Sequence, residues 1–155
     1  MDQAVSRDRT REFAEFVIGL APDDLSAADR KQLDGLILDH LGVALRGACL
    51  PWGVALAKWA LPYDGTGPCV VFGTALKVTP PVAGMVNASA AHGMELDDTH
   101  DESITHPGAV VIATALAVGT EVRAPGTAVL AAIVGGYEVM ARIGAATGAA
   151  DILEH

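Results

Sequence analysis

Apolar residues recur every three or four positions through most of this sequence, in runs that prolines interrupt. This spacing is typical of helices that bury one face. It predicts a first helix between the cap Thr10 and Pro22, and a second between the cap Ser26 and a stop at Gly47. Proline suits the first turn of a helix. Further helices are therefore expected to begin at Pro51, Pro80 and Pro107, and a last one at about Thr127.

Residues 68–79 break the helical pattern. The stretch from Cys69 to Phe72 is β-branched and aromatic, and Gly73 to Ala75 separates it from a second short apolar stretch. Such residues, bounded by glycine and proline, favour strands. We therefore predict an all-α fold, a multi-helix array with a small extended or hairpin insertion near residues 68–79.

The same pattern predicts which residues form the core. His40 lies on the apolar stripe of the second helix, so we expect a buried and hydrogen-bonded histidine. Trp52 and Trp59 are expected to anchor the core. The last helix is rich in glycine and is expected to lie in the interior or in a subunit interface. The buried side of the helix after Pro107 is expected to consist of Val110, Val111, Thr114 and Val118.

The composition limits the classes of protein. With 155 residues, of which 51% are hydrophobic and 19% charged, the chain suffices for one helical domain with a core, taken as residues 1–150. The formal net charge of −9 argues against binding to nucleic acid or to an anionic membrane, because both require clustered lysine and arginine. We expect neither as a partner.

The termini and cysteines bear on location. Residues 1–10 are polar and lack the apolar segment of a signal peptide, and charged residues interrupt the apolar run Ala128–Gly136 before it reaches spanning length. Cys49 and Cys69 are too few for a disulfide framework, so a cytoplasmic location is expected. Residues 151–155 end in Leu-Glu-His and are expected to be a tag or cloning remnant.

The most polar segment runs from Ala91 to Gly108 and separates two apolar helices. Three uses of it are open: a general base with a polar clamp for a substrate, a divalent-metal site, or a solvated acidic loop with capping residues. The residue types suit a metal, but their spacing matches no specific metal motif. The segment contains the histidines His92, His100 and His106 and the carboxylates Glu95, Asp97, Asp98, Asp101 and Glu102.

His106 directly precedes Pro107, and the residue before a proline is biased towards extended backbone. His106 is therefore expected at or next to the N-cap of the following helix. The free N–H groups of Gly108 and Ala109 would then face the same space, and helix N-termini bind anions. The imidazole adds a proton donor or acceptor. This segment thus predicts a place to hold a carboxylate beside an acid/base group.

Several motifs can be compared with a known family. They are Thr10–Phe16, Leu38–Ala44, Pro80-Pro81, Asn87–His100, His106–Ala109 and Gly136–Arg142. Together they resemble the MmgE/PrpD family, which includes 2-methylcitrate dehydratase, cis-aconitate decarboxylase and iminodisuccinate epimerase. The resemblance covers nearly the whole chain apart from its tail.

The resemblance implies a large helical domain joined to a smaller α/β lid domain, usually in a homodimer. It also implies chemistry on small di- or tricarboxylates with no required metal or organic cofactor, and we expect none here. In the family, the positions of Glu95, Thr99 and His106 line the active site. The acidic position is often aspartate, so Glu95 is a departure, and the Thr99–His106 spacing is one residue longer than in the decarboxylases. Family members are also much longer, with active-site lysines and a further histidine beyond the point where this sequence ends.

We therefore expect part of a lyase that removes a proton next to a carboxylate and then eliminates water, as 2-methylcitrate dehydratase does. His106 and Glu95 are the predicted catalytic residues. Thr99, Asp97 and Asp98 are predicted to bind the substrate, with the two aspartates fixing the loop. The other two histidines of the segment are expected to support it.

Two alternatives remain open. An isomerase resembling iminodisuccinate epimerase would remove and return a proton, and a non-catalytic helical module would only oligomerise. Developing negative charge next to a carboxylate needs cations or preorganised donors, and the polar segment contains no lysine or arginine. The isolated chain is therefore expected to be nearly inactive.

Overall fold

The computed structural model describes residues 8–148. The predicted remnant 151–155 lies outside these residues. Six helices are present in the described part: α1 (Arg9–Gly19), α2 (Ala27–Ala48), α3 (Pro51–Ala60), α4 (Pro80–His92), α5 (Pro107–Glu121) and α6 (Gly126–Ala146). Short 3₁₀ turns form at η1 (Pro22–Asp24), η2 (Leu61–Tyr63) and η3 (Asp101–Ser103). Strands β1 (Cys69–Val70) and β2 (Lys77–Val78) pair antiparallel, with Cys69 opposite Val78. The predicted helical array with a small hairpin is confirmed.

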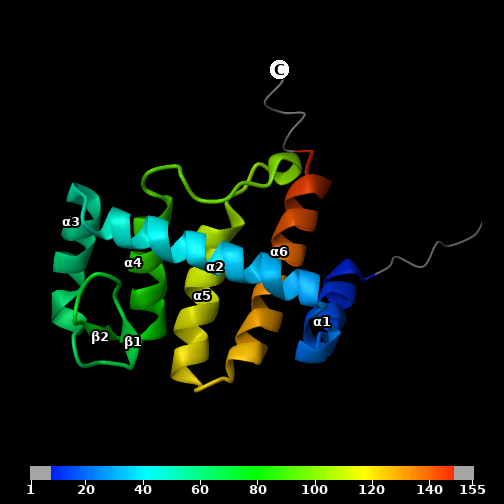
Figure 1. Ribbon diagram of the computed structural model, residues 1–155, viewed down its shortest axis with the longest axis horizontal. Helices are drawn as coiled ribbons and strands as arrows, with labels where there is room; N and C mark the ends of the chain where they lie inside the picture. The colour runs from blue at the N-terminus through cyan, green and yellow to red at the C-terminus, as the bar shows by residue number, and fades with distance from the viewer. Residues whose placement is uncertain (1–7, 149–155) are drawn as a thin grey trace, which may run out of the picture.

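The long helix α2 crosses α4, α5 and α6 in Figure 1, with α3 and the hairpin at one end and α1 at the other. Leu33 of α2, Ile112 of α5 and Ile133 of α6 form one buried apolar cluster that joins these three helices. A second cluster joins the hairpin to α3, α4 and α5 through Val71, Val78 and neighbouring residues. The segment between α4 and α5 passes over the end of this array and brings η3 against α6 (Figure 1).

Local capping signals explain where the first helices begin. The Ser26 hydroxyl accepts a hydrogen bond from the Asp29 backbone, and the Asp29 carboxylate accepts one from the Ser26 backbone. This reciprocal capping box confirms the predicted start of α2. The prediction for α1 was wrong by two residues, because the side chain of Asp8, not that of Thr10, accepts a hydrogen bond from the backbone of Arg11.

A Ser26→Ala variant is expected to lose about 1 kcal/mol of unfolding free energy, because the first turn of α2 loses its side-chain acceptor. Chemical denaturation measures the difference. Thr127→Ala is the control, since Thr127 is exposed near the start of α6 and makes no capping hydrogen bond there. Equal stabilities for the two variants would contradict the role of Ser26.

The capping box also has a pH dependence. Hydrogen bonds from the Ser26 hydroxyl and backbone N–H lower the pKa of Asp29 below its ordinary value of 3.8. A carboxyl whose pKa is lower in the folded state stabilises the fold above its unfolded pKa and loses this contribution as pH falls through the folded value. The Asp29 contribution is therefore present at neutral pH and is lost in acid.

Gly47 does not stop α2 as predicted, because the helix continues to Ala48 and Cys49 is its C-cap. Gly47 is buried, and a Cβ atom there would collide with the backbone carbonyl of Ala90 in α4. Its role is therefore close contact between two helices. Ala44 and Ala91 are buried beside this crossing, so small side chains set the distance between α2 and α4.

Two predictions of core residues were wrong. Trp52 and Trp59 are 40% and 46% exposed, because they lie on α3 at the edge of the array. On α5, Val110 and Val118 are 52% and 47% exposed, Thr114 is exposed and Val111 is only partly buried. The buried face of α5 instead consists of Pro107, Gly108, Ala109, Ile112, Ala113 and Ala117. Small residues on α4 and α5 let these helices pack closely, and this contact decides which side of α5 is covered.

Helix α6 is less buried than predicted. In the part that the structure describes, only Ala131, Ile133 and Gly135 of this helix are buried, so an interior position is wrong and an interface position stays a prediction. By length and composition alone, α6 could span a membrane, as could the sharply bent pair of α2 and α3. Core helices of globular proteins share this length and composition. Here α6 packs against α5, α1 and η3.

His40 is buried as predicted, with 2% exposure, but the predicted hydrogen bond is absent. Neither ring nitrogen has a partner among residues 8–148, and the ring meets the edge of Phe72. Burial lowers the pKa of His40, although the charges of Asp98 and Asp97 act in the opposite direction. His40 is therefore a core residue in contact with an aromatic side chain.

Candidate active site

The polar segment between α4 and α5 is held by its own hydrogen bonds. The backbones of His100 and Thr105 pair as an isolated antiparallel bridge. Inside this turn, the Ser103 hydroxyl lies 2.9 Å from Nδ1 of His100 and 2.7 Å from the hydroxyl of Thr105. His100 thus lies where a supporting residue was expected, and it contributes to the turn that leads into α5.

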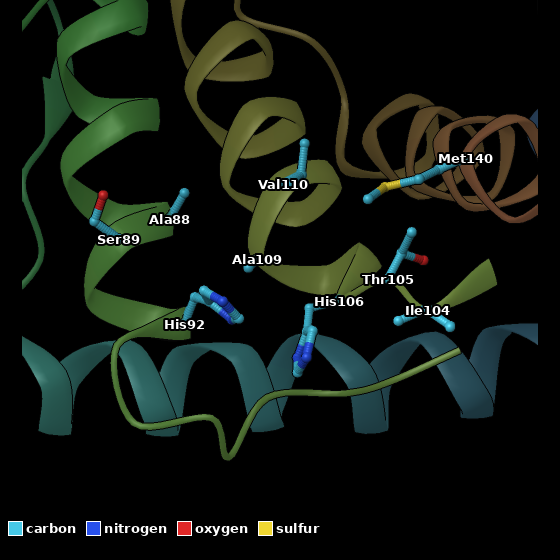
Figure 2. A pocket seen from close by; sticks show the side chains of 9 residues that line it. All are labelled: Ala88, Ser89, His92, Ile104, Thr105, His106, Ala109, Val110 and Met140. Carbon is cyan, nitrogen blue, oxygen red and sulfur yellow. The ribbon is translucent and has the colours of Figure 1, made fainter. Parts of the chain in front are cut away.

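Two histidines from different helix ends face each other. His92 is the last residue of α4, and His106 is the N-cap of α5, as its place before Pro107 predicted. Their ring centroids are 4.5 Å apart at an angle of 66°. Figure 2 shows both imidazoles turned towards the same space below Ala109. His92 was expected only to support the loop, and its pairing with the ring of His106 was not predicted.

Asp97 lies beneath both imidazoles. Its side chain is 1% exposed, and its oxygens lie 3.2 Å from Nδ1 of His92 and 3.3 Å from Nδ1 of His106. The contact with His92 has hydrogen-bond geometry. The contact with His106 does not, and Nδ1 of His106 is a buried atom with no hydrogen-bond partner among residues 8–148. A buried carboxylate thus faces the inner nitrogens of both rings.

Glu95 lies on the opposite side of the two rings. Its carboxylate oxygens are 3.4 Å from Nε2 of His92 and 3.6 Å from Nε2 of His106, and its side chain is 71% exposed. Its backbone is left-handed, with φ of 54°, which few residues other than glycine adopt. The imidazoles therefore lie between a buried carboxylate and an exposed one.

Asp98 holds the beginning of α5 in place. Its carboxylate accepts hydrogen bonds from the backbone N–H of Gly108, at 2.9 Å, and from the hydroxyl of Tyr137, at 2.8 Å. The N–H of Gly108 was expected to be free for an anionic ligand, and this is wrong because Asp98 occupies it. Burial, with help from Asp98, raises the pKa of Tyr137.

Sequence reasoning missed the role of Tyr137 and assigned this residue only to a family motif. The available signal was chemical: the hydroxyl of a buried tyrosine in a largely apolar helix needs a hydrogen-bond partner. The sequence separates Tyr137 from Asp98 by 39 positions, so no local pattern identifies the partner. The contact ties α6 to the loop and to the first turn of α5.

A cavity of about 420 Å³ opens beside the two histidines (Figure 2). Its walls are apolar apart from His92, His106, Ser89 and Thr105, and no described residue that lines it is lysine or arginine. Thr99 lies elsewhere, against a smaller cavity of about 210 Å³ to which His106 also contributes. The structure therefore brings Glu95, Asp97 and His106 together and places Thr99 on another side of His106.

This geometry can support proton transfer. A carboxylate beside one imidazole nitrogen fixes the ring and favours a proton on that nitrogen, which leaves the other free to accept a proton. The Asp97 carboxylate lies 3.3 Å from Nδ1 of His106, where a small rotation of the ring would make this contact a hydrogen bond, and Nε2 is the nitrogen near the exposed Glu95. The arrangement is that of an acid/base histidine supported by a buried carboxylate.

The sequence comparisons identify the family. The family described as the MmgE/PrpD N-terminal domain matches residues 11–155, and the chain belongs to this family. It is 31% identical to cis-aconitate decarboxylase from Aspergillus terreus over 152 residues. The matched region is 94% of this chain and 31% of that relative. It is 32% identical over 152 residues to the cis-aconitate decarboxylase-like protein oryM from Aspergillus oryzae, covering 93% of this chain and 31% of the relative.

A third relative is more distant. Cis-aconitate decarboxylase from Mus musculus is 29% identical over 104 residues, which is 66% of this chain and 21% of that protein. The chain thus spans less than a third of the length of the two fungal relatives.

Proposed function

We propose that this chain supplies an acid/base site for a lyase that acts on small di- or tricarboxylates. The observation that carries the proposal is the placement of His106, at the N-cap of α5, between the buried Asp97 and the cavity beside α4. In this proposal a small rotation of the His106 ring turns the 3.3 Å contact of Nδ1 with Asp97 into a hydrogen bond that orients the ring, and Nε2 transfers the proton. The names of the relatives, which are cis-aconitate decarboxylases, support a tricarboxylate as the substrate.

The other site residues have separate roles in this proposal. Glu95 lies near the Nε2 atoms of His92 and His106. It orients the substrate or relays the proton that the substrate loses. Thr99 contacts substrate only if the ligand reaches the smaller cavity on the other side of His106. Asp98 is a positioning residue, because both its oxygens already have protein partners.

The proposed reaction is proton abstraction next to a carboxylate followed by elimination of water. A second candidate is decarboxylation of cis-aconitate, which the names of the relatives favour. In that reaction a carbon–carboxylate bond breaks, carbon dioxide leaves and His106 delivers a proton to carbon. Release of carbon dioxide from cis-aconitate distinguishes the second reaction from the first.

Either reaction builds negative charge that cations or donors must stabilise. The cavity beside His106 has no lysine or arginine among its described lining residues. The 155-residue chain alone is therefore expected to bind carboxylates weakly and to turn them over very slowly, so the decisive measurement is binding at the imidazoles. Its assembly as a homodimer stays a prediction.

The proposal predicts that tricarboxylates bind beside His92 and His106. Titration with cis-aconitate, followed by NMR of the histidine ring protons, is expected to shift the signals of these two residues at millimolar ligand. A His106→Ala variant is expected to lower the affinity at least about tenfold, because the ligand loses its charged or hydrogen-bonding partner. Circular dichroism checks that this variant remains folded.

His100→Ala provides the matched control, since His100 belongs to the same loop but does not line the larger cavity. It is expected to leave the affinity within about twofold of the original chain. Acetate, a monocarboxylate, is expected to bind far more weakly than cis-aconitate. If cis-aconitate leaves the signals of His92 and His106 unchanged, the site proposed here is wrong and a non-catalytic module becomes the better interpretation.

A further inference from the structure

His92, Asp97 and His106 form a cluster whose chemistry extends beyond proton transfer. One ligand atom from each residue lies within 4.8 Å of those of the other two. Two imidazole nitrogens and a carboxylate oxygen are the donor set of many transition-metal sites. The carboxylate is buried, so it differs from the exposed acidic groups common on protein surfaces.

The distances suit a bound ion. Ligands at 2.0–2.2 Å from a tetrahedral zinc ion lie roughly 3.3–3.5 Å from one another. The Asp97 oxygens lie 3.2 Å from Nδ1 of His92 and 3.3 Å from Nδ1 of His106. The third separation, between the ligand nitrogens of the two imidazoles, is no more than 4.8 Å, so rotations of the side chains can bring all three atoms into a common coordination sphere.

The unpaired Nδ1 atom of His106 is a second, independent observation in favour of a bound ion. Its Nδ1 is buried and has no hydrogen-bond partner among residues 8–148, although the Asp97 carboxylate is nearby. Leaving a buried polar atom unpaired is costly, and such atoms require an explanation. A metal ion between Nδ1 and the carboxylate would satisfy both without requiring a linear N–H···O contact.

We propose that His92, Asp97 and His106 bind one divalent transition-metal ion, of which zinc is the best match. Imidazole ligands favour zinc, cobalt and nickel over magnesium and calcium, which prefer oxygen ligands. Three protein ligands leave a fourth position for water. The side chain of His92 is 45% exposed, so the ion can enter from that side of the cluster.

Metal binding and acid/base chemistry at His106 exclude each other. An imidazole that binds the ion through Nδ1 carries its remaining proton on Nε2, which then can donate but not accept a hydrogen bond. Zinc therefore inhibits the proton transfer proposed for His106. This consequence rests on the proposed function, whereas the metal site itself depends only on the three side chains.

The test uses the full chain with His155→Ala, so that the terminal histidine cannot contribute to binding. Cobalt titration is expected to produce visible d–d absorption that saturates at one ion per chain, and zinc is expected to displace the cobalt. His92→Ala and Asp97→Asn are expected to weaken zinc binding by on the order of 100-fold, because even outer partners of metal ligands are worth 10–100-fold. Calorimetry measures these affinities in the absence of any carboxylate ligand.

The matched control is His100→Ala, which removes a histidine from the same loop but outside the cluster. It is expected to bind zinc like the starting chain. Absence of cobalt absorption, or zinc affinity unchanged in His92→Ala, would overturn the metal site. The metal site would also be overturned if magnesium bound as tightly as zinc and bound equally well to His92→Ala. Such a result would indicate only a solvated acidic loop. Circular dichroism establishes folding, and His92→Ala decides the question if Asp97→Asn does not fold.

Discussion

A Gly47→Val variant is expected to lose roughly 3 kcal/mol or more of unfolding free energy, a value at the upper end for overpacked cores. The added side chain would occupy the position of the Ala90 backbone carbonyl. This atom belongs to α4 and cannot rotate away as a flexible side chain could. The helices α2 and α4 would have to separate, and the buried contacts of Ala44 and Ala91 would be lost with them.

Chemical denaturation of Gly47→Val beside Gly42→Val measures this effect. Gly42 lies in the same helix, is exposed, and has nothing within 4 Å of an added Cβ. Valine and glycine differ by less than about 1 kcal/mol in helix propensity, so Gly42→Val is expected to change stability only slightly. Similar losses for the two variants would show that close packing of α2 on α4 does not depend on Gly47.

An Asp98→Ala variant is expected to lose about 2–4 kcal/mol. It removes one carboxylate and leaves two groups without a partner, the N–H of Gly108 and the hydroxyl of Tyr137, each worth roughly 1–3 kcal/mol when buried and unpaired. It also frees the first turn of α5, whose N-cap is His106. The variant is therefore expected to lose carboxylate binding as well as stability.

Asp101→Ala is the control, because Asp101 is an exposed carboxylate of the same loop. It is expected to change stability by less than about 0.5 kcal/mol, as for most surface positions. Asp98→Asn is expected to recover part of the loss, since its amide can still accept from Gly108. If Asp98→Ala were as stable as Asp101→Ala, the hydrogen bonds of Asp98 with Gly108 and Tyr137 would not hold the site in place.

The hydrogen bond from Tyr137 to Asp98 also makes the stability of the fold depend on pH. The pKa of Tyr137 is raised above the ordinary value of 10.0, first by burial and then by Asp98. A group whose pKa is higher in the folded state stabilises the fold below its unfolded pKa and loses this contribution as pH rises. Stability is therefore expected to fall above about pH 10, and a Tyr137→Phe variant is expected to show a smaller fall in denaturation experiments.

Most helix boundaries could be predicted because their signals are local. Ser26 with Asp29, and proline at the first position of α3, α4 and α5, act within one turn of the chain. The buried face of α5 could not be predicted in this way. It contains proline, glycine, three alanines and a single isoleucine, and its burial depends on which neighbouring helix approaches closely. Hydrophobicity alone pointed to Val110 and Val118, which are the exposed residues.

The candidate site also combines features that local sequence predicts with features that depend on how the helices pack. The position of His106 followed from the proline after it, which is a property of two adjacent residues. The pairing of His92 with His106 and the contact of Asp98 with Tyr137 depend on how α4, α5 and α6 meet. The ligand types in the loop were visible in the sequence, but only the fold separates the buried Asp97 from the exposed Glu95.

The left-handed backbone of Glu95 links side-chain reach to conformational cost. Among residues other than glycine, aspartate and asparagine adopt this conformation more readily than glutamate does. Aspartate would relax the backbone, but its carboxylate would stop one methylene short of the two imidazole rings. Glutamate therefore reaches the Nε2 atoms of His92 and His106 from a backbone conformation that it adopts less readily than aspartate does, so the contact of Glu95 with both rings has a conformational cost.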